Sequence, residues 1–447
     1  MQLNMPEDVN LIIKKLQDAG YEAYAVGGCV RDSYMGAVPH DWDITTSALP
    51  GQVKELFRRT IDVGIQHGTV VVMMGKEGYE VTTYRIDGVY EDNRHPKQVS
   101  FTPDLKEDLK RRDFTINAMA YSEKTGIVDL FGGKEDIRRG IIRAVGNPKE
   151  RFSEDALRIM RALRFAARFN YEIDKDTEEA IRELAPNLST ISAERVRDEL
   201  EKMILSDHPD IIRKAYEYGI TRIVFPEWDE IMKCEQNTPY HFLNVGEHTI
   251  LAMQRLVSDY PDISDEDKRV LRLAALLHDI GKPKMKTTDE NGVNHFKGHP
   301  RESKEIASKM LRRLKYDNDT IDRVLKLVLY HDTRPVLTAP NVRRMIIDVG
   351  KSNMCNLLRL KQVDMEAQSD YRLKERIEDI RGLTKLYEQI IENGDCLSIS
   401  DLAVNGRDLI DRGYKEGPQL GKKLKEIFEA VIEDPTLNNR EALLKMV

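Results

Sequence analysis

The chain has 447 residues and a net charge of −7, and 40% of its residues are hydrophobic while 32% are charged. This length predicts two to four domains, and the composition is ordinary for a helix-rich globular protein. We expect no transmembrane segment, because the apolar runs are short, and no signal peptide, because the first residues are polar. The four cysteines are scattered along the chain, so we expect no cysteine-bound metal knuckle but reduced thiols, which are typical of the cytoplasm.

A helix is predicted over residues 5–20, where apolar residues recur on one face, and a short apolar strand at residues 24–26 follows it. Gly27 and Gly28 come directly after this strand. Glycines let the backbone approach a ligand, and their amides can point at phosphate oxygens. Together with Arg31, in the run Gly-Gly-Cys-Val-Arg-Asp, they predict a cradle for nucleotide phosphates.

Asp41 and Asp43 come next, in a run of Trp, Ile and Thr residues that favours a strand. Residues two apart on a strand share one face, with Cα atoms roughly 6.6 Å apart. Such carboxylates can hold two Mg²⁺ ions about 3.5–4 Å apart, which suits in-line phosphoryl transfer. The alternative is the acidic solvent face of an edge strand, and the preceding glycine run favours the metal site over it.

A second helix is predicted over residues 50–60, followed by a hairpin whose second strand begins near Glu80. Residues 86–98 are polar and rich in turn formers, which predicts a loop.

The runs GGCVRD and HDWDITTSA resemble the core of class II CCA-adding tRNA nucleotidyltransferases and bacterial poly(A) polymerases, members of the polymerase-beta-like superfamily. The resemblance implies a third metal-site carboxylate, for which Glu80 is the candidate; the alternative is a plain strand acid. It also implies that a loop at residues 86–98, with Asp92, Arg94 and His95, helps to switch the site from CTP to ATP. Such a loop argues against an enzyme that adds only C.

The run RRDFTINA, at residues 111–118, resembles motif B of the same family. The resemblance implies that Arg111 and Arg112 meet triphosphate oxygens. It further implies that Asp113 and Asn117 hydrogen-bond the ribose hydroxyls. An alternative role for Asp113 is the N-cap of a helix that runs through Asn117, which is compatible with the ribose contact.

A single helix is predicted over residues 152–169, with Ser153 as its N-cap and with Glu154 and Asp155 at its positive end. The sequence Glu-Asp-x-x-Arg at its start resembles motif D of the family. The resemblance implies that Asp155 and Arg158, one turn apart on one face, mimic a Watson–Crick edge and select cytosine or adenine. Arg161 continues this face, and we include it among the nucleotide-binding residues.

Nine Lys and Arg residues but only three acids lie between residues 138 and 168, which predicts a localised contact with a phosphate backbone, or otherwise a solvated helix face. Residues 174–205 predict two further helices, and AERVRDELEKMIL in the second resembles motif E of the neck. We assign Arg195, Glu199 and Glu201 there to neck stability and to no chemistry.

A second constellation begins after residue 237. Its members stand in the order H…HD…H…H…D, which resembles the HD phosphohydrolase domain: His248, His278, Asp279, His299, His331 and Asp364. Imidazole and carboxylate ligands fit Mn²⁺, Ni²⁺, iron or Mg²⁺ better than a closed zinc site. A metal-bound hydroxide could then attack a phosphoester. The alternatives are isolated helix histidines and a domain that is purely structural.

We therefore predict an α+β, mostly α protein, with a small mixed-sheet head at 1–145, a helical neck at 146–235, an HD domain at 236–370 and a tRNA-binding body and tail at 371–447. The expected function is template-independent CCA addition to tRNA 3′ ends from CTP and ATP in the cytoplasm, with Mg²⁺ in the head and Mn²⁺, Ni²⁺ or another divalent metal in the HD domain. The alternatives are a poly(A) polymerase and an HD phosphohydrolase acting on phosphate ends of RNA or on nucleotides. The sequence leaves the oligomeric state open.

Overall fold

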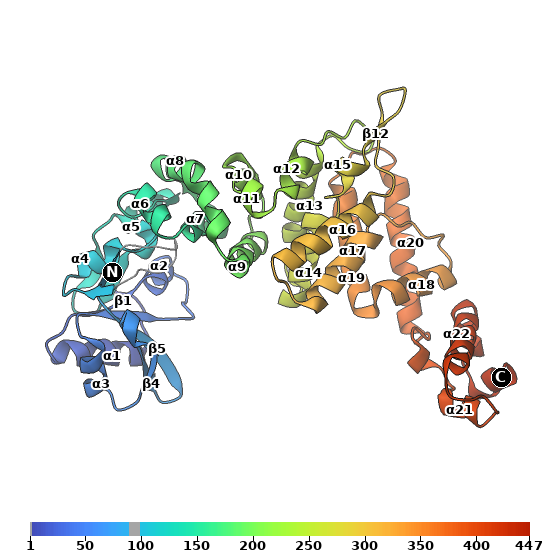
Figure 1. Ribbon diagram of the computed structural model, residues 1–447, viewed down its shortest axis with the longest axis horizontal. Coiled ribbons are helices and arrows are strands. Elements are labelled where there is room, and N and C mark those ends of the chain that lie inside the picture. The colour runs from blue at the N-terminus through green and yellow to red at the C-terminus, as the bar shows by residue number, and fades with distance from the viewer. Residues whose placement is uncertain (1, 89–98) are drawn as a thin grey trace. The chain divides into compact units, whose positions relative to one another are not determined.

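The computed structural model describes residues 2–88 and 99–447 (Figure 1). Its contacts divide the chain into two compact units, Met1–Pro226 and Glu227–Val447. The predicted loop at 86–98 lies mostly outside the described residues, including Asp92, Arg94 and His95. Its first two residues are wrong as a loop, because they belong to strand β6 (Arg85–Asp87), which pairs with β7 (Val99–Phe101). The finer division into four segments remains a prediction.

The first unit is built on a seven-stranded mixed sheet in the order β3-β4-β5-β2-β1-β8-β9. Every neighbouring pair is antiparallel except β2 with β5, which are parallel. The strands are β1 (Ala23–Val26), β2 (Asp43–Thr46), β3 (Thr60–Gly64), β4 (Thr69–Met74), β5 (Glu77–Thr83), β8 (Met119–Ser122) and β9 (Gly126–Asp129). The predicted small mixed sheet is confirmed.

Helices α1 (Glu7–Asp18) and α3 (Pro50–Leu56) pack on this sheet. The buried side chains of α1 are Val9, Ile12, Ile13 and Leu16, at the spacing of one helix face, and they join the apolar side chains of β1, β2 and β4 in one core. The other helices of the head are α2 (Gly28–Tyr34), α4 (Leu105–Lys110) and α5 (Gly133–Arg139). The opposite face of β2 is therefore left for polar side chains.

The helix predicted over residues 152–169 is wrong as a single element. The structure has two helices there, α6 (Pro148–Glu154) and α7 (Leu157–Phe169), separated at Asp155, whose backbone is extended. Asn147 caps α6, so Ser153 lies inside a helix and is no N-cap. The short strands β10 (Ile141–Ile142) and β11 (Glu172–Ile173) pair beside α7.

The rest of the first unit is helical. It contains α8 (Lys175–Leu184), α9 (Ala193–Ile204), α10 (Ile211–Glu217) and α11 (Thr221–Val224), with α7 packed against α9. The two helices predicted over residues 174–205 are thereby confirmed as α8 and α9.

The second unit is almost entirely helical (Figure 1). Its helices are α12 (Glu227–Met232), α13 (Val245–Asp259), α14 (Asp265–Leu277), α15 (Lys282–Met285), α16 (His299–Arg313), α17 (Asn318–Tyr330), α18 (Ala339–Val349), α19 (Lys351–Glu366), α20 (Leu373–Glu392), α21 (Gly406–Ile410), α22 (Pro418–Glu433) and α23 (Arg440–Lys445), with one hairpin of β12 (Thr287–Thr288) and β13 (Asn294–His295). The α+β, mostly α fold class is confirmed. In the described part of the chain, no helix combines the length and the apolar character needed to cross a bilayer.

Candidate active site and metal cluster

Asp41 and Asp43 lie at the start of β2, and both are exposed. The strand begins at Asp43, so Asp41 lies in the segment before it and the expectation that one strand carries both is wrong. Desolvation by the surrounding protein raises the pKa of Asp43, Arg112 lowers it, and the charge of Asp41 raises it further. A carboxylate whose ionisation is disfavoured by a second carboxylate nearby is stabilised when a divalent cation binds both.

Glu80 lies beside this pair through the register of the sheet. β2 and β5 run parallel with Ile44 opposite Val81, so the preceding residues, Asp43 and Glu80, are neighbours on the polar face. Neighbouring strands lie about 4.8 Å apart, which is within reach of a shared ion. Among the described residues, however, the three carboxylates do not form a cluster with all ligand atoms within 4.8 Å of one another. The side chains would have to move toward one another to bind a shared ion.

Gly27 and Arg112 form the adjoining surface. Gly27 has φ of 86°, and a Cβ built there would lie 2.9 Å from a guanidinium nitrogen of Arg112. Only glycine combines this backbone conformation with so close an approach. Burial lowers the pKa of Arg112, Asp108 and Asp43 raise it, and its buried Nε has no hydrogen-bond partner in the described part of the chain. The structure thus leaves one donor of this guanidinium unpartnered among the described residues, and the contact with a triphosphate remains a prediction.

Gly28 begins α2, and Arg31 lies on the same helix. The guanidinium of Arg31 is buried, donates to Asn117 Oδ1 and Asp32, and stacks on Phe165 and Phe169 at 5.2 and 4.9 Å from the ring centroids. These contacts occupy the side chain that the sequence assigned to phosphate. In this structure Arg31 holds Asn117 and joins α2 to α7.

Asp113 is the centre of the predicted ribose site. Its Oδ1 accepts hydrogen bonds from the Phe114 amide (2.8 Å) and from Asn117 Nδ2 (3.1 Å), while Oδ2 is paired with Arg161 at 2.6 Å. Burial raises the pKa of Asp113, but Arg161 and Asn117 outweigh burial and hold the pKa well below its usual range. Phe114 takes the N-cap position of the short 3₁₀ turn Thr115–Asn117, so the alternative of Asp113 as a helix N-cap is wrong.

The two residues predicted to select the base lie near the break between α6 and α7. Arg195 pairs with Asp155 Oδ2 at 2.7 Å, and the Leu157 amide donates to Oδ1. Because Asp155 is extended and outside α7, the expected arrangement of one face of one helix is wrong. Our assignment of Arg195 to neck stability alone also needs correction, since its guanidinium holds the carboxylate of Asp155.

Arg158 is fixed by a different set of partners. It pairs with Glu154 at 2.6 Å and donates to the carbonyls of Arg151 and Arg111, each at 3.0 Å. Arg158 therefore sits directly above the backbone of motif B, and its orientation depends on that backbone.

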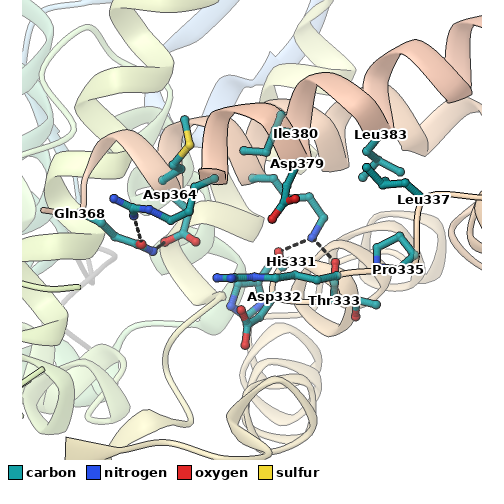
Figure 2. Close-up of a pocket in the computed structure, with 14 residues that line it drawn as sticks. His331, Asp332, Thr333, Pro335, Leu337, Asp364, Gln368, Asp379, Ile380 and Leu383 are labelled. Atoms are coloured by element: carbon teal, nitrogen blue, oxygen red, sulfur yellow. Dashed lines mark hydrogen bonds between the residues drawn. The ribbon is translucent and has the colours of Figure 1, made fainter. Parts of the chain in front are cut away.

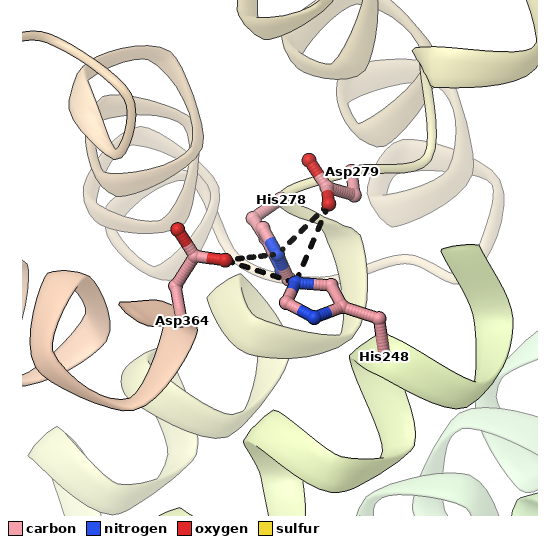
Figure 3. Close-up of side chains that lie close together, drawn as sticks. All are labelled: His248, His278, Asp279 and Asp364. Atoms are coloured by element: carbon pink, nitrogen blue, oxygen red, sulfur yellow. Dashed lines mark hydrogen bonds and ion pairs between the residues drawn. The ribbon is translucent and has the colours of Figure 1, made fainter. Parts of the chain in front are cut away.

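In the second unit, six predicted ligands converge from five helical elements. Figure 3 shows four of them, His248, His278, Asp279 and Asp364. His248 Nε2 lies 2.9 Å from Asp364 Oδ1, and His278 Nε2 lies 3.3 Å from Asp279 Oδ2. On the other oxygen of Asp279, His299 Nε2 lies at 3.2 Å and His331 Nε2 at 3.5 Å. The ligand atoms fall into two sets that share Asp279: one with His248, His278 and Asp364, and one with His299 and His331.

The imidazole tautomers follow from the backbone. Each Nδ1 faces a carbonyl oxygen, at 3.2 Å in His248, 2.7 Å in His278, 2.9 Å in His299 and 2.7 Å in His331. A carbonyl only accepts, so each Nδ1 carries a proton and each Nε2 faces the centre of the cluster, where it can become a metal ligand. The Nε2 atoms of His299 and His331 lie 3.1 Å apart, where two lone pairs repel unless a cation lies between them.

The rings differ in charge. Burial lowers the pKa of His278, but Asp279 and Asp364 outweigh burial and raise it to about 10, so this ring carries a proton on Nε2 that a bound metal ion would displace. Burial raises the pKa of Asp279, but His278 and Lys282 outweigh burial and hold the pKa well below its usual value; Lys282 Nζ lies 2.6 Å from Oδ2. Burial lowers the pKa of His331, and the neighbouring histidines lower it further, so its imidazole stays neutral. Neutral imidazoles and ionised carboxylates are the donor set of a first-row divalent metal. The residues present fit such an ion.

Two pockets open beside the cluster. One, of about 160 Å³, lies along α19 and α20 (Figure 2); there the buried Lys361 donates to the carbonyls of His331 (2.6 Å) and Thr333 (2.7 Å). The other, of about 560 Å³, is lined by four of the six ligands, by the cations Lys282, Lys297 and Arg334, and by Asp332. A molecule with a phosphate group would find both space and opposite charge there.

Comparison with known proteins places these sites in a family. Family models match residues 23–143 (Poly A polymerase head domain), 170–232 ("Probable RNA and SrmB- binding site of polymerase A") and 301–447 (tRNA nucleotidyltransferase domain 2). A protein of Leuconostoc mesenteroides named CCA-adding enzyme is 35% identical over 98% of this chain and 95% of its own, and one of Streptococcus mutans is 35% identical over 98% and 95%. The crystal structure of the Bacillus stearothermophilus CCA-adding enzyme in complex with CTP is similar with a TM-score of 0.72 and 30% identity, covering 99% of this chain and 97% of that one.

Proposed function

The chain belongs to the family of CCA-adding enzymes, and from this premise we propose that it adds CCA to tRNA 3′ ends from CTP and ATP. The observation that carries the proposal is the similarity over nearly the whole chain, including residues 23–143, which contain the aspartate pair. The relatives' names do not favour a poly(A) polymerase or a hydrolase as the main activity. Its four cysteines are free thiols, which is consistent with the reducing cytoplasm.

We assign the chemical step to the head. Family membership implies use of a divalent metal, and we propose Mg²⁺ held by Asp41 and Asp43, with Glu80 as a third ligand. When bound, Mg²⁺ activates the tRNA 3′-hydroxyl and neutralises the charge that develops on the leaving pyrophosphate. The exposed carboxylates at the start of β2 orient the reacting groups from the polar face of the sheet.

The nucleotide is held by the residues around this pair. We propose that two kinds of group bind the triphosphate: the amides of Gly27 and Gly28, and the guanidinium groups of Arg111 and Arg112. The reason is that Arg112 lies against Gly27 and its Nε has no partner in the described part of the chain. The pair Asp113 and Asn117, locked by Arg161 and Arg31, would meet the ribose.

Base selection falls to Asp155 and Arg158. A carboxylate acceptor beside a guanidinium donor offers complementary hydrogen bonds to cytosine or adenine. Arg195 and Glu154 hold the two side chains before a nucleotide arrives. Exchange of the acid and the base between these two positions should abolish C/A selectivity, and retained selectivity would refute this assignment alone.

The test uses tRNA transcripts that end at the discriminator base, at C and at CC, each incubated with labelled CTP or ATP and resolved at single-nucleotide length. Two C additions and one A, followed by a stop, are expected. Asp41→Ala should abolish incorporation. Asp62→Ala should not, because Asp62 is an exposed aspartate on β3 that pairs only with Lys54 among the ion pairs described. Long A tails would identify a poly(A) polymerase instead, and activity in Asp41→Ala would refute the metal assignment.

We also propose that the second unit binds Mn²⁺, Ni²⁺ or a similar divalent ion and hydrolyses a phosphate ester. The converging Nε2 atoms and the cationic 560 Å³ pocket above them support this second activity. Phosphate release from a nucleoside monophosphate should require added Mn²⁺ or Ni²⁺ and be lost in His278→Ala. If His278→Ala releases phosphate at the wild-type rate, the activity does not belong to this cluster.

A further inference from the structure

Asp108 is a buried carboxylate of the head that none of the assignments above uses. It lies on α4, is 0% exposed, and comes shortly before motif B in the chain. A buried carboxylate is costly unless several donors satisfy it, so its partners indicate what it is for.

Two of these partners are Arg111 and Arg112, the arginines assigned to the triphosphate. Arg111 donates from Nε and from a terminal nitrogen to Asp108 Oδ1, at 2.9 and 2.8 Å. A terminal nitrogen of Arg112 lies 3.9 Å from Oδ2. The carboxylate thus anchors one guanidinium through paired hydrogen bonds and attracts the other electrostatically.

The remaining partners join these arginines to the sheet. The Thr45 hydroxyl donates to Asp108 Oδ2 at 3.0 Å, and the Arg85 amide approaches Oδ1 at 3.4 Å. Thr45 lies two residues after Asp43 on β2, so both side chains are on the polar face of that strand. One carboxylate therefore connects the metal-bearing strand to the phosphate-binding arginines.

We propose that Asp108 is a positioning residue for nucleotidyl transfer, which sets the two arginines of motif B in register with the strand that carries the catalytic aspartates. It does not touch the nucleotide; it fixes the orientation of the Arg111 and Arg112 guanidinium groups. The inference rests on the proposed function, because it concerns the binding of the triphosphate at that site.

The test compares Asp108→Asn with Asp136→Asn. Asp136 is a matched control, since it is a buried carboxylate of the same unit that accepts from Thr115 Oγ1 at 2.7 Å and pairs with Arg143 at 3.2 Å. In Asp108→Asn, the KM values for CTP and ATP should both rise about tenfold, as expected from loss of one charge-assisted hydrogen bond, with kcat changed much less. The inhibition constant of inorganic tripolyphosphate, which has no base or ribose, should rise in parallel.

The control distinguishes positioning of the arginines by Asp108 from a purely structural role of a buried carboxylate. Asp136→Asn should lower the melting temperature without raising either KM or the tripolyphosphate constant. The proposal is overturned if Asp108→Asn raises these constants no more than Asp136→Asn does. If Asp108→Asn fails to fold, Thr45→Val is the second variant, since it removes only the hydroxyl donor. It should raise the KM values and the tripolyphosphate inhibition constant about threefold, and unchanged constants in Thr45→Val would also overturn the proposal. Failure of the proposed function itself would appear separately, as absence of incorporation by the wild-type enzyme.

Discussion

Metal binding to the cluster of the second unit should stabilise that unit measurably. The structure holds four imidazoles and two carboxylates together, with the ligand atoms of each set within 4.8 Å of one another. An ion that binds only the folded state stabilises it by about 2.7 kcal/mol at a free concentration about 100-fold above Kd. For a unit of roughly 150–250 residues, this corresponds to a rise in melting temperature of about 5–10 °C.

The assay is scanning calorimetry of the full chain, with chelator and then with MnCl₂ or NiCl₂, combined with metal analysis of the dialysed protein. Because two ligand sets share Asp279, wild type should bind two ions per chain. His299→Ala should retain one ion and part of the thermal shift. His295→Ala is the matched control, since His295 is exposed, pairs with Asp289 and lies outside both sets, and it should behave as wild type.

The reasoning would be refuted by absence of any thermal shift with Mn²⁺, Ni²⁺ or iron. It would also be refuted if His295→Ala and His299→Ala lost the shift equally, because binding would then not depend on the converging Nε2 atoms. One ion per chain in wild type, unaffected by His299→Ala, would contradict the shared role of Asp279.

Three further outcomes follow from the structure. Gly27→Ala should lower the free energy of unfolding by about 1–2 kcal/mol, as expected for positive φ, and should also raise the KM for CTP, because the added Cβ displaces Arg112. At Gly20, φ is also positive but no atom lies within 4 Å of the added Cβ, so Gly20→Ala should lower stability in urea titrations and leave the KM unchanged. Asp113 has a depressed pKa in the folded state, so its stabilising contribution is present above its unfolded pKa of about 3.9 and is lost as pH falls below it. The free energy of unfolding, plotted against pH, should therefore fall less steeply at acid pH in Asp113→Asn than in wild type, and an unchanged slope would contradict this cause. Iodoacetamide should label Cys355 alone in the native protein, since it is the exposed cysteine, and all four cysteines in urea, as counted by peptide mass mapping.

Much of both sites could be predicted from the sequence, because the chemistry lies in residue identity and order. The run GGCVRD, the aspartate pair and the order of histidines and aspartates of the cluster are short patterns of ligands, and each fixes which atoms are available. The α1 face and the hairpin of β4 and β5 could likewise be predicted, since periodicity records which side chains face a core.

Local prediction failed where a contact distant in the chain overrides it. The run around Asp155 has helical propensity throughout, but Asp155 adopts an extended backbone and pairs with Arg195, forty residues further along. The role of Arg195 was missed for the same reason, because no spacing rule relates two residues on different helices. Arg31 was assigned to phosphate from its motif, and only the structure shows that it is buried against Asn117 and two aromatic rings.

The sequence by itself determined the fold class, and it supplied the identity of the candidate ligands and of the proposed phosphate cradle. Only the tertiary structure decided that Asp279 is shared between two ligand sets, that Glu80 lies beside Asp43, and that Asp108 connects β2 to motif B. The physical reason is that propensity and periodicity act over a few residues, whereas strand register and the convergence of helices depend on how the whole core packs. Distances between ligand atoms, which decide binding, are therefore properties of the folded chain.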